Sequence, residues 1–344
     1  MAIAADNLRR AFPGWEEARV QATARGVYAH FATMVLDILW MEGRPVEELL
    51  ALADIEGLEH LTAALARGQG VVSPLAHLGN WEFQGVTTAP LVGPSAVVAR
   101  PLDNPGLDRR LVAFRASTGN IVIYKQKALP EVLKNLRERR IVGIVVDQNV
   151  QARDGIFVRF FGRPASATTV AAALALKTGC PIVPARCVLR SDGRYRMVYG
   201  PPLAWSSSGR RGEDLARLTQ DIASIIEGWV RETPEQWLWL HRRWKTQPPP
   251  SRVPSSRETP DPAGLSGSAV SRPVAPEPSA PVPAEVPPKL PSEPTSEPTS
   301  KPTSKLPSEV PPELPPEGPA EGPVEGPVEG PVEGPVEGPR GEPR

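Results

Sequence analysis

One histidine and one glutamate stand five positions apart in the segment SPLAHLGNWEF, residues 73–83. The chain has only 4 histidines in 344 residues, and His77 directly follows a short apolar run. An imidazole steadied by a neighbouring carboxylate forms the base-and-orienter half of a catalytic triad. We therefore interpret His77 as a candidate general base and Glu82 as the residue that fixes its tautomer.

The sequence around His77 contains no obvious nucleophile, since neither a G-x-S-x-G elbow nor a catalytic-cysteine motif is present. The nucleophile is therefore expected to arrive with the substrate, so that His77 deprotonates an acceptor hydroxyl that attacks an activated acyl group. The spacing H-x-x-x-x-E also differs from the H-E-x-x-H of zinc proteases, and we expect no metal. A structural histidine, hydrogen-bonded at the end of a strand, is the alternative that these residues leave open.

Apolar runs alternate with helical patterns through the middle of the chain. The expected strands cover residues 70–77, 96–102, 120–125, 140–149, 181–190 and 195–200. The expected helices cover residues 15–42, 56–67, 81–90, 104–118, 127–139, 166–178 and 212–232. This order predicts an α/β fold, a layered α/β/α sandwich with a largely parallel central sheet and room for an antiparallel edge over 181–200.

The predicted sheet places two candidate residues together. Ligands bind beyond the carboxyl ends of parallel strands, and His77 and Asp147 each stand at such an end. Asn80 is a preferred N-cap residue, so the next helix is expected to begin there. Glu82 then lies in the first helical turn, where the helix dipole favours a carboxylate, and can bend back toward the imidazole.

The composition changes abruptly after residue 250. From Ser251 to Arg344 there is no Phe, Trp, Tyr, His, Cys or Met, and the repeat EGPV recurs near the end. Such a segment cannot bury enough apolar surface to offset the entropy of ordering it. We predict one folded domain over residues 1–250 and a disordered, proline-rich tail over 251–344.

The net charge of zero hides an uneven distribution. The tail holds 15 acidic and 8 basic side chains, and the whole chain has 39 of each, so residues 1–250 hold 31 basic and 24 acidic side chains. This surplus suits an acidic partner or an anionic membrane surface, although it can also serve solubility alone. Two cysteines, Cys180 and Cys187, make neither a zinc site nor a disulfide framework, which favours a reducing compartment.

Seven motifs occur in an order that marks a known family. They are HLGNWE, ARPLDNP, FRASTG, VVDQN, FVRFFGRPASAT, LALKTGCPIVP and PEQWLWLHRRWKT. Together they resemble the HtrB-type lipid A biosynthesis (lauroyl/myristoyl) acyltransferases of the lysophospholipid acyltransferase superfamily, over about residues 6–246. In that family the catalytic histidine and acidic residue match His77 and Glu82, and two further motif residues match Arg115 and Asp147.

The resemblance implies an acyltransferase that moves a fatty acyl group from acyl carrier protein or acyl-CoA to a hydroxyl of a lipid A precursor or related glycolipid. It implies neither a metal nor an organic cofactor, and no nucleic-acid partner is expected. The alternatives are an acyltransferase for another lysolipid, a lipid-binding scaffold without turnover, or a hydrolase in which water replaces the acceptor. The scaffold does not need the His77–Glu82 contact, so the geometry of that pair discriminates between a scaffold and an acyltransferase.

The remaining site residues are expected to hold charge. Arg115 and Arg100 suit either the oxyanion of acyl transfer or the phosphates of the acceptor. Asp147 is expected either to orient Arg115 or to bind acceptor hydroxyls, with capping of the next turn as its structural alternative. The residues expected to bind substrate are Arg100, Asn80, Gln148 and Gly162.

Typical family members carry a spanning helix before an N-L-R-x-x-F-P motif, and here NLRRAFP already begins at residue 7. No run of about eighteen apolar residues is present. We therefore expect a peripheral protein on the cytoplasmic face of the bacterial inner membrane. Three tryptophans among basic residues in WLWLHRRWK, residues 237–245, suit a membrane interface, while core packing is the competing interpretation. The small residues of VAAALAL, 170–176, suit either an acyl-chain groove or close packing.

Overall fold

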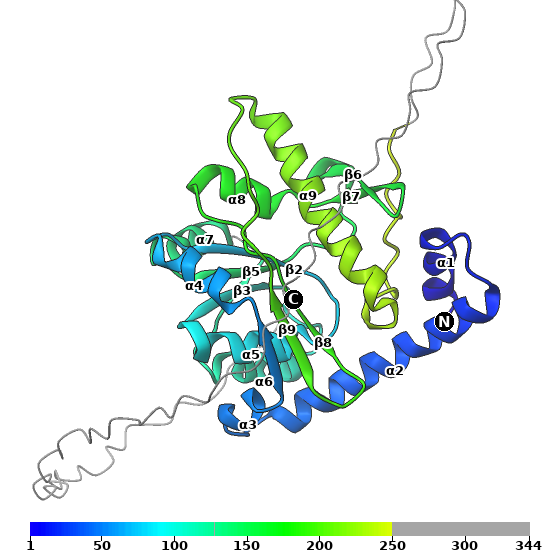
Figure 1. The fold of residues 1–344 in the computed structure, drawn as a ribbon, viewed down its shortest axis with the longest axis horizontal. Coiled ribbons are helices and arrows are strands. Elements are labelled where there is room, and N and C mark those ends of the chain that lie inside the picture. Colours follow the sequence, from blue (N-terminus) through cyan, green and yellow to red (C-terminus); the bar gives the residue numbers. More distant parts are fainter. Residues whose placement is uncertain (127, 250–344) are drawn as a thin grey trace, which may run out of the picture. The chain divides into compact units, whose positions relative to one another are not determined.

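A four-stranded parallel sheet forms the centre of the molecule in the computed structural model, which describes residues 1–126 and 128–249 (Figure 1). Its strands, in spatial order, are β2 (Val71–Leu75), β5 (Ile141–Val145), β3 (Ser95–Ala99) and β4 (Ile121–Tyr124). All three pairings are parallel, so the predicted parallel sheet is confirmed. The tail over residues 251–344, which we expect to be disordered, lies outside the described residues.

A second sheet adjoins the first. It contains β1 (Ala53–Glu56), β9 (Tyr195–Tyr199) and β8 (Ala185–Leu189) in that order. Strands β8 and β9 are antiparallel, as expected for residues 181–200, whereas β1 pairs in parallel with β9. A parallel bridge between Val72 and Ile182 links β2 to the segment that leads into β8.

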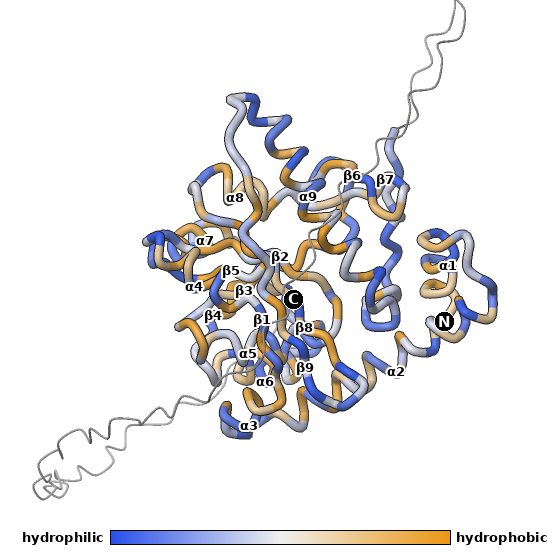
Figure 2. Tube along the Cα trace, in the orientation of Figure 1, coloured by the Kyte–Doolittle hydropathy of each residue, from blue (hydrophilic) through white to orange (hydrophobic). Residues whose placement is uncertain are grey.

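Helices cover both faces of the central sheet. Neighbouring strand residues point to opposite faces, so Val71 and Ile141 pack in one apolar cluster while Val72 and Val142 pack in the other. The first cluster is closed by α4 (Leu58–Ala66), α5 (Trp81–Val92) and α6 (Pro105–Ala116). The second is closed by α7 (Ala128–Arg137), α8 (Val170–Thr178) and α9 (Arg211–Glu232). This arrangement is the predicted α/β/α sandwich, and Figure 2 shows its hydrophobic segments alternating with polar ones.

The structure adds elements that the sequence patterns do not reveal. They are α1 (Ala2–Ala11), α3 (Val46–Leu50), β1, and the antiparallel hairpin of β6 (Ile156–Phe160) and β7 (Arg163–Ala167). Two single-turn 3₁₀ helices lie at Ala152–Asp154 and Pro234–Gln236. The long helix α2 (Glu17–Met41) runs along one side of the body from α1 to α3 (Figure 1).

Candidate active site

The carboxyl ends of β2 and β5 bring His77 and Asp147 together. Leu75 and Val145 are paired across the two parallel strands, so the residues two positions further along face each other. The Nδ1 atom of His77 lies 2.7 Å from Oδ1 of Asp147. The backbone N–H of His77 donates to Oδ2 of the same carboxylate at 2.8 Å. His77 and Asp147 are therefore in contact, as their positions at the two strand ends predict.

Asp147 is a buried anion with three hydrogen-bond donors. Its third donor is Nε1 of Trp237, 2.7 Å from Oδ2, and only 3% of the residue is exposed. Burial raises the pKa of Asp147, but the charge and hydrogen bond of His77, the charge of His241 and the Trp237 hydrogen bond lower it to about 2. The carboxylate is therefore ionised at neutral pH and accepts the Nδ1–H of His77.

His77 keeps its second ring nitrogen available. Its side chain is 20% exposed, and Nδ1 is occupied by Asp147, so Nε2 is the atom that can accept a proton from a substrate. Burial lowers the pKa of His77, but the charge and hydrogen bond of Asp147, with a smaller contribution from the charge of Glu82, raise it above its ordinary value. The imidazole is thus a strengthened base in its correct tautomer.

The turn after His77 is fixed by segments far away in the chain. Gly79 has φ +63°, and a Cβ atom there would lie 1.8 Å from the carbonyl oxygen of Cys187 in β8. Its N–H donates to the carbonyl of Gln236 at 2.9 Å, and its own carbonyl lies 3.1 Å from Nε2 of His30 in α2. The position needs glycine because both the backbone conformation and the close approach exclude a side chain.

Asn80 has a structural place that accounts for both ends of its amide. Its Oδ1 accepts the N–H of Phe83 at 2.9 Å, which confirms the predicted N-cap of α5. Its Nδ2 donates to the hydroxyl of Tyr195 at 3.0 Å, and the residue is 1% exposed. Asn80 was expected to bind substrate, but the structure instead uses its side chain to hold the turn and the helix start.

Glu82 does not take the place expected for it. In the described part of the chain it makes no hydrogen bond to His77, because Asp147 already holds Nδ1 and Arg115 of α6 clamps the glutamate from the other side. The Nε and Nη2 atoms of Arg115 donate to the two carboxylate oxygens at 2.8 and 2.6 Å. Orientation of Arg115 by Asp147, an expectation from sequence, is likewise replaced by this Glu82–Arg115 pair.

Trp81 connects the Glu82–Arg115 pair with the imidazole. Its Nε1 donates to Oε1 of Glu82 at 2.9 Å, and its ring meets the ring of His77 edge-on at 4.9 Å between centroids. On its other side, its ring centroid is 6.0 Å from that of Phe31 in α2. Arg115 keeps 18% of its side chain exposed, so its charge remains accessible to solvent beside Trp81.

The other residues expected to bind substrate occupy different places. Gln148 is exposed directly after Asp147, and Arg100 directly follows β3, so both lie at the strand edge that carries His77. Arg100 is exposed and pairs with Asp103 at 2.8 Å. Gly162 instead forms the two-residue turn of the β6–β7 hairpin with Phe161, where both residues have positive φ. That turn requirement accounts for the glycine.

The C-terminal tryptophans are core residues and do not face a membrane. Trp237 and Trp239 are 0% exposed and Trp244 is 5% exposed, so for these side chains the core-packing interpretation is confirmed and the interfacial one is wrong. Trp237 donates to Asp147, and His241 lies 5.5 Å from the Trp237 ring. The motif PEQWLWLHRRWKT marked this segment, but composition alone did not distinguish a core element that supports the site from an interfacial one.

Two cavities with apolar side chains in their lining bear on lipid binding, while a third, of about 640 Å³ beside Gly162, is lined by polar side chains and glycines. The cavity beside Asp147 and the α8 alanines Ala171 and Ala172 has a volume of only about 20 Å³, which is room for a single water and excludes a fatty chain. A cavity of about 300 Å³ lies between the end of α2, α3, α5 and α6. Apolar lining residues of the larger cavity are Met41, Val46, Leu49, Val86, Pro90 and Phe114. Within residues 1–126 and 128–249, no group of three acidic, histidine or cysteine side chains could hold a metal ion.

Comparisons with known proteins agree with the motifs. A family model for bacterial lipid A biosynthesis acyltransferases matches residues 1–246. A phosphatidylinositol mannoside acyltransferase of Mycobacterium tuberculosis (strain ATCC 25618 / H37Rv) is 33% identical over 194 residues, covering 55% of this chain and 59% of the relative. The protein of the same name from Mycolicibacterium smegmatis is 31% identical over 206 residues, covering 59% and 64%.

A lipid A biosynthesis lauroyltransferase of Escherichia coli (strain K12) is 27% identical over 206 residues, covering 59% of this chain and 65% of the relative. The chain thus matches about six-tenths of the length of these curated relatives. The family model covers the whole segment that contains His77, Glu82, Arg115 and Asp147. The chain belongs to the bacterial lipid A biosynthesis acyltransferase family.

Proposed function

We propose that this protein transfers a fatty acyl group from a thioester donor, acyl carrier protein or acyl-CoA, to a hydroxyl of a membrane glycolipid. The acceptor is a lipid A precursor or a mannosylated phosphatidylinositol, the two acceptor types that the relatives' names suggest. The observation that carries the proposal is the His77 imidazole, held through Nδ1 by a buried carboxylate and still 20% exposed. In the described residues the expected His77–Glu82 hydrogen bond is absent, which by itself suits a scaffold, but Asp147 supplies the carboxylate and the imidazole stays accessible, which suits an enzyme.

The geometry supports a general-base mechanism. With Asp147 ionised and accepting the Nδ1–H, the lone pair of Nε2 takes the proton of the acceptor hydroxyl. The resulting oxygen nucleophile attacks the thioester carbonyl, a C–O bond forms, and the C–S bond breaks. The proton on Nε2 then passes to the leaving thiolate, which returns His77 to its neutral form. Asp147 stays ionised throughout and stabilises the transient imidazolium.

The Glu82–Arg115 pair lies next to the reacting groups and does not exchange a proton in this mechanism. Because Glu82 neutralises much of the charge of Arg115, we assign the pair to positioning Trp81 and the entrance of the site. The exposed part of Arg115, with Arg100 and Gln148 at the same strand edge, suits the phosphates of the acceptor or the oxyanion. Glu82 also favours the imidazolium of His77 through its charge.

The larger cavity has more room for an acyl chain than the small cavity beside α8. The cavity of about 300 Å³ is at the lower end of the range typical of ligand pockets, and its lining is about equally polar and apolar, with Arg44, Ser117 and Thr118 beside the apolar side chains. The cavity lies against α5. The first turn of this helix is beside His77, and its later residues Val86 and Pro90 line the cavity. We therefore assign the fatty chain to this cavity, and close packing, the competing interpretation, to the small residues of α8.

Replacing His77 by alanine in the full chain tests the mechanism. We expect the transfer rate from radiolabelled acyl-CoA or acyl carrier protein to fall by about 10²–10⁴-fold, the usual contribution of a general base. His60→Ala in α4 is the matched control and should keep the wild-type rate, with circular dichroism verifying that both variants fold. Full transfer by the His77→Ala protein would exclude this mechanism.

A further inference from the structure

Helix α2 exposes an unusual number of large apolar side chains. They are Tyr28, Val35, Leu36, Leu39 and Trp40, with 40%, 52%, 65%, 49% and 45% of their surface exposed. Spacings of three, four, seven and eight residues place them along one side of the helix. We call this set the docking face. Figure 2 shows that hydrophobic residues predominate in the second half of α2, where most of the docking face lies.

The docking face is separate from the side of α2 that packs on the body. The buried side chains His30, Met34 and Met41 lie on the other side of the helix. No helix within residues 1–126 and 128–249 is long and apolar enough to cross a membrane. A helix with one anchored side and one exposed apolar side suits binding in the plane of a bilayer surface.

The charges around the docking face suit anionic headgroups. Between Glu17 and Glu42 the helix has a single acidic residue, Asp37, which accepts a hydrogen bond from the Tyr195 hydroxyl on the body side. Arg25 is exposed one turn before Tyr28. At the other end, the guanidinium of Arg44 stacks over Trp40 at 4.0 Å from the ring centroid while it pairs with Glu48.

Helix α2 is linked to the active site through aromatic contacts of Phe31, which is not part of the docking face. Phe31, on the same helix, has its ring centroid 6.0 Å from that of Trp81, and Trp81 lies 4.9 Å from the His77 ring. The larger cavity begins at the carboxyl end of α2, where Met41 and Arg44 line it. The rings of Phe31 and Trp81 therefore link α2 to the base.

We propose that the docking face of α2 inserts into the surface of an anionic lipid bilayer and delivers membrane-bound acceptor to His77. The apolar side chains enter the headgroup–acyl boundary, and Arg25 and Arg44 stay at the phosphates. The delivery step rests on the proposed acyl transfer, whereas the binding step does not. We assign the membrane contact to the docking face and not to the C-terminal tryptophans, because those side chains are buried.

Vesicle co-sedimentation of the full chain tests the binding step. We compare wild type with a Leu36→Ser/Leu39→Ser double variant on phosphatidylcholine vesicles with and without phosphatidylglycerol. Loss of two exposed leucines should weaken binding by about 10-fold or more, with little effect on folding because both side chains are solvent-exposed. The matched control is Leu129→Ser/Val170→Ser, which removes exposed apolar side chains from α7 and α8 and should bind like wild type.

Additional arms separate this inference from the catalytic proposal. The His77→Ala protein should bind vesicles as wild type does, whatever its activity. The α2 variant should lose transfer to bilayer-embedded acceptor and keep transfer to acceptor dispersed in detergent. Equal vesicle binding by the α2 and control variants would overturn the proposal. So would a halved mass of the α2 variant by light scattering with unchanged vesicle binding, because the face would then join two copies of the chain.

Discussion

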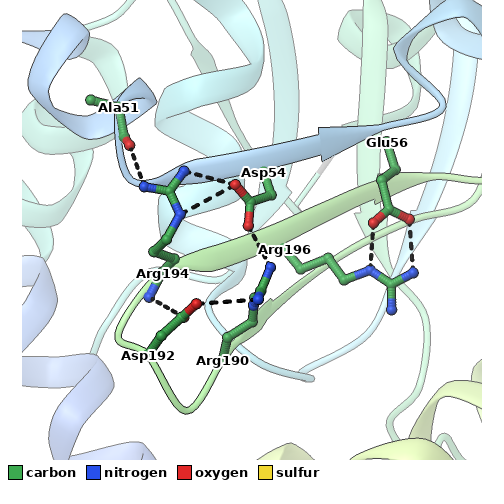
Figure 3. A network of polar contacts seen from close by, with 7 residues as sticks. All are labelled: Ala51, Asp54, Glu56, Arg190, Asp192, Arg194 and Arg196. Atoms are coloured by element: carbon green, nitrogen blue, oxygen red, sulfur yellow. Dashed lines mark hydrogen bonds and ion pairs between the residues drawn. The ribbon is translucent and has the colours of Figure 1, made fainter. Parts of the chain in front are cut away.

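Two clusters of acidic and basic side chains in this protein differ in what surrounds them. In the site, Asp147 is buried and receives donors from His77 and Trp237. On the surface, strands β1, β8 and β9 present Asp54 and Glu56 to three arginines (Figure 3). Asp54 contacts Arg190 at 2.6 Å and Arg194 at 2.7 Å, and Glu56 contacts Arg196 at 2.7 Å.

The two clusters have different partners for their carboxylates. In the surface cluster the hydrogen bonds of Arg194 and Arg196 lower the pKa values of Asp54 and Glu56, but arginine keeps its proton and water screens the pairs. In the site the partner of Asp147 is an imidazole, which can gain and lose a proton. A buried carboxylate beside a partner that can exchange a proton can therefore take part in the proposed acyl transfer, whereas a carboxylate paired with arginine at the surface lacks such a partner.

Removal of the carboxylate charge in the site should have the largest effect. In Asp147→Asn we expect transfer to fall by about 10²–10⁴-fold, because an amide at that position no longer requires a proton on Nδ1 and Nε2 can become protonated. The charge of Asp147 raises the pKa of His77, so its loss lowers that pKa. The rising limb of kcat/KM with pH should therefore move to lower pH, measured between about pH 5 and 9.

Stability gives an independent check on Asp147→Asn. His77 has a raised pKa in the folded state, so its stabilising contribution is complete below its unfolded pKa, about 6.5, and is lost as pH rises through the folded value. The difference in Tm between wild type and variant should be larger at pH 6 than at pH 9. An unchanged pH limb with an unchanged rate would show that Asp147 does not act on His77.

An intermediate effect is expected for the Glu82–Arg115 pair, which is less buried than Asp147. In Glu82→Gln we expect the free energy of unfolding to fall by about 1–3 kcal/mol, because the two hydrogen bonds from Arg115 lose their charged acceptor. The rate should fall less than in Asp147→Asn, since Glu82 reaches His77 through its charge and makes no hydrogen bond to it in the described residues. Chemical denaturation and steady-state kinetics measure the two effects.

A double-mutant cycle with Arg115→Gln distinguishes structure from substrate binding. If Arg115 serves only Glu82, the double variant should recover stability and its KM for the acceptor should match that of Glu82→Gln. If Arg115 also binds the acceptor phosphate, KM should rise further in the double variant. Additive losses of stability would contradict the paired arrangement of these two side chains.

The sequence alone predicts the features of the site that follow from neighbouring residues or from the general geometry of parallel sheets. Parallel strands end at one edge, so the positions of His77 and Asp147 after two apolar runs were sufficient to place them together. Asn80 as a helix cap follows from residue preference at a turn. Both inferences depend on geometry within a few residues or on a general property of parallel sheets.

The partner of Glu82 depends on longer-range packing and was predicted wrongly. Proximity in sequence favoured His77, whereas the packing of α5 on α6 brings Arg115 to the glutamate from 33 residues away. The tryptophans near the C-terminus posed a similar problem, because aromatic and basic composition is the same for an interfacial segment and a buried one. Strand β1 was missed because its residues ADIE form only a short, partly exposed run.

The smallest effect is expected in the surface cluster. In Asp54→Asn the ionic contacts to Arg190 and Arg194 become neutral, but solvent already screens them, so Tm should change by no more than about 2–4 °C. The transfer rate and its pH limb should match wild type, and 1 M salt should remove the Tm difference because the Debye length is then about 3 Å. A loss of transfer comparable to that of Asp147→Asn would contradict the distinction between the clusters, since it would mean that an exposed arginine-paired carboxylate supports the reaction as strongly as the buried one.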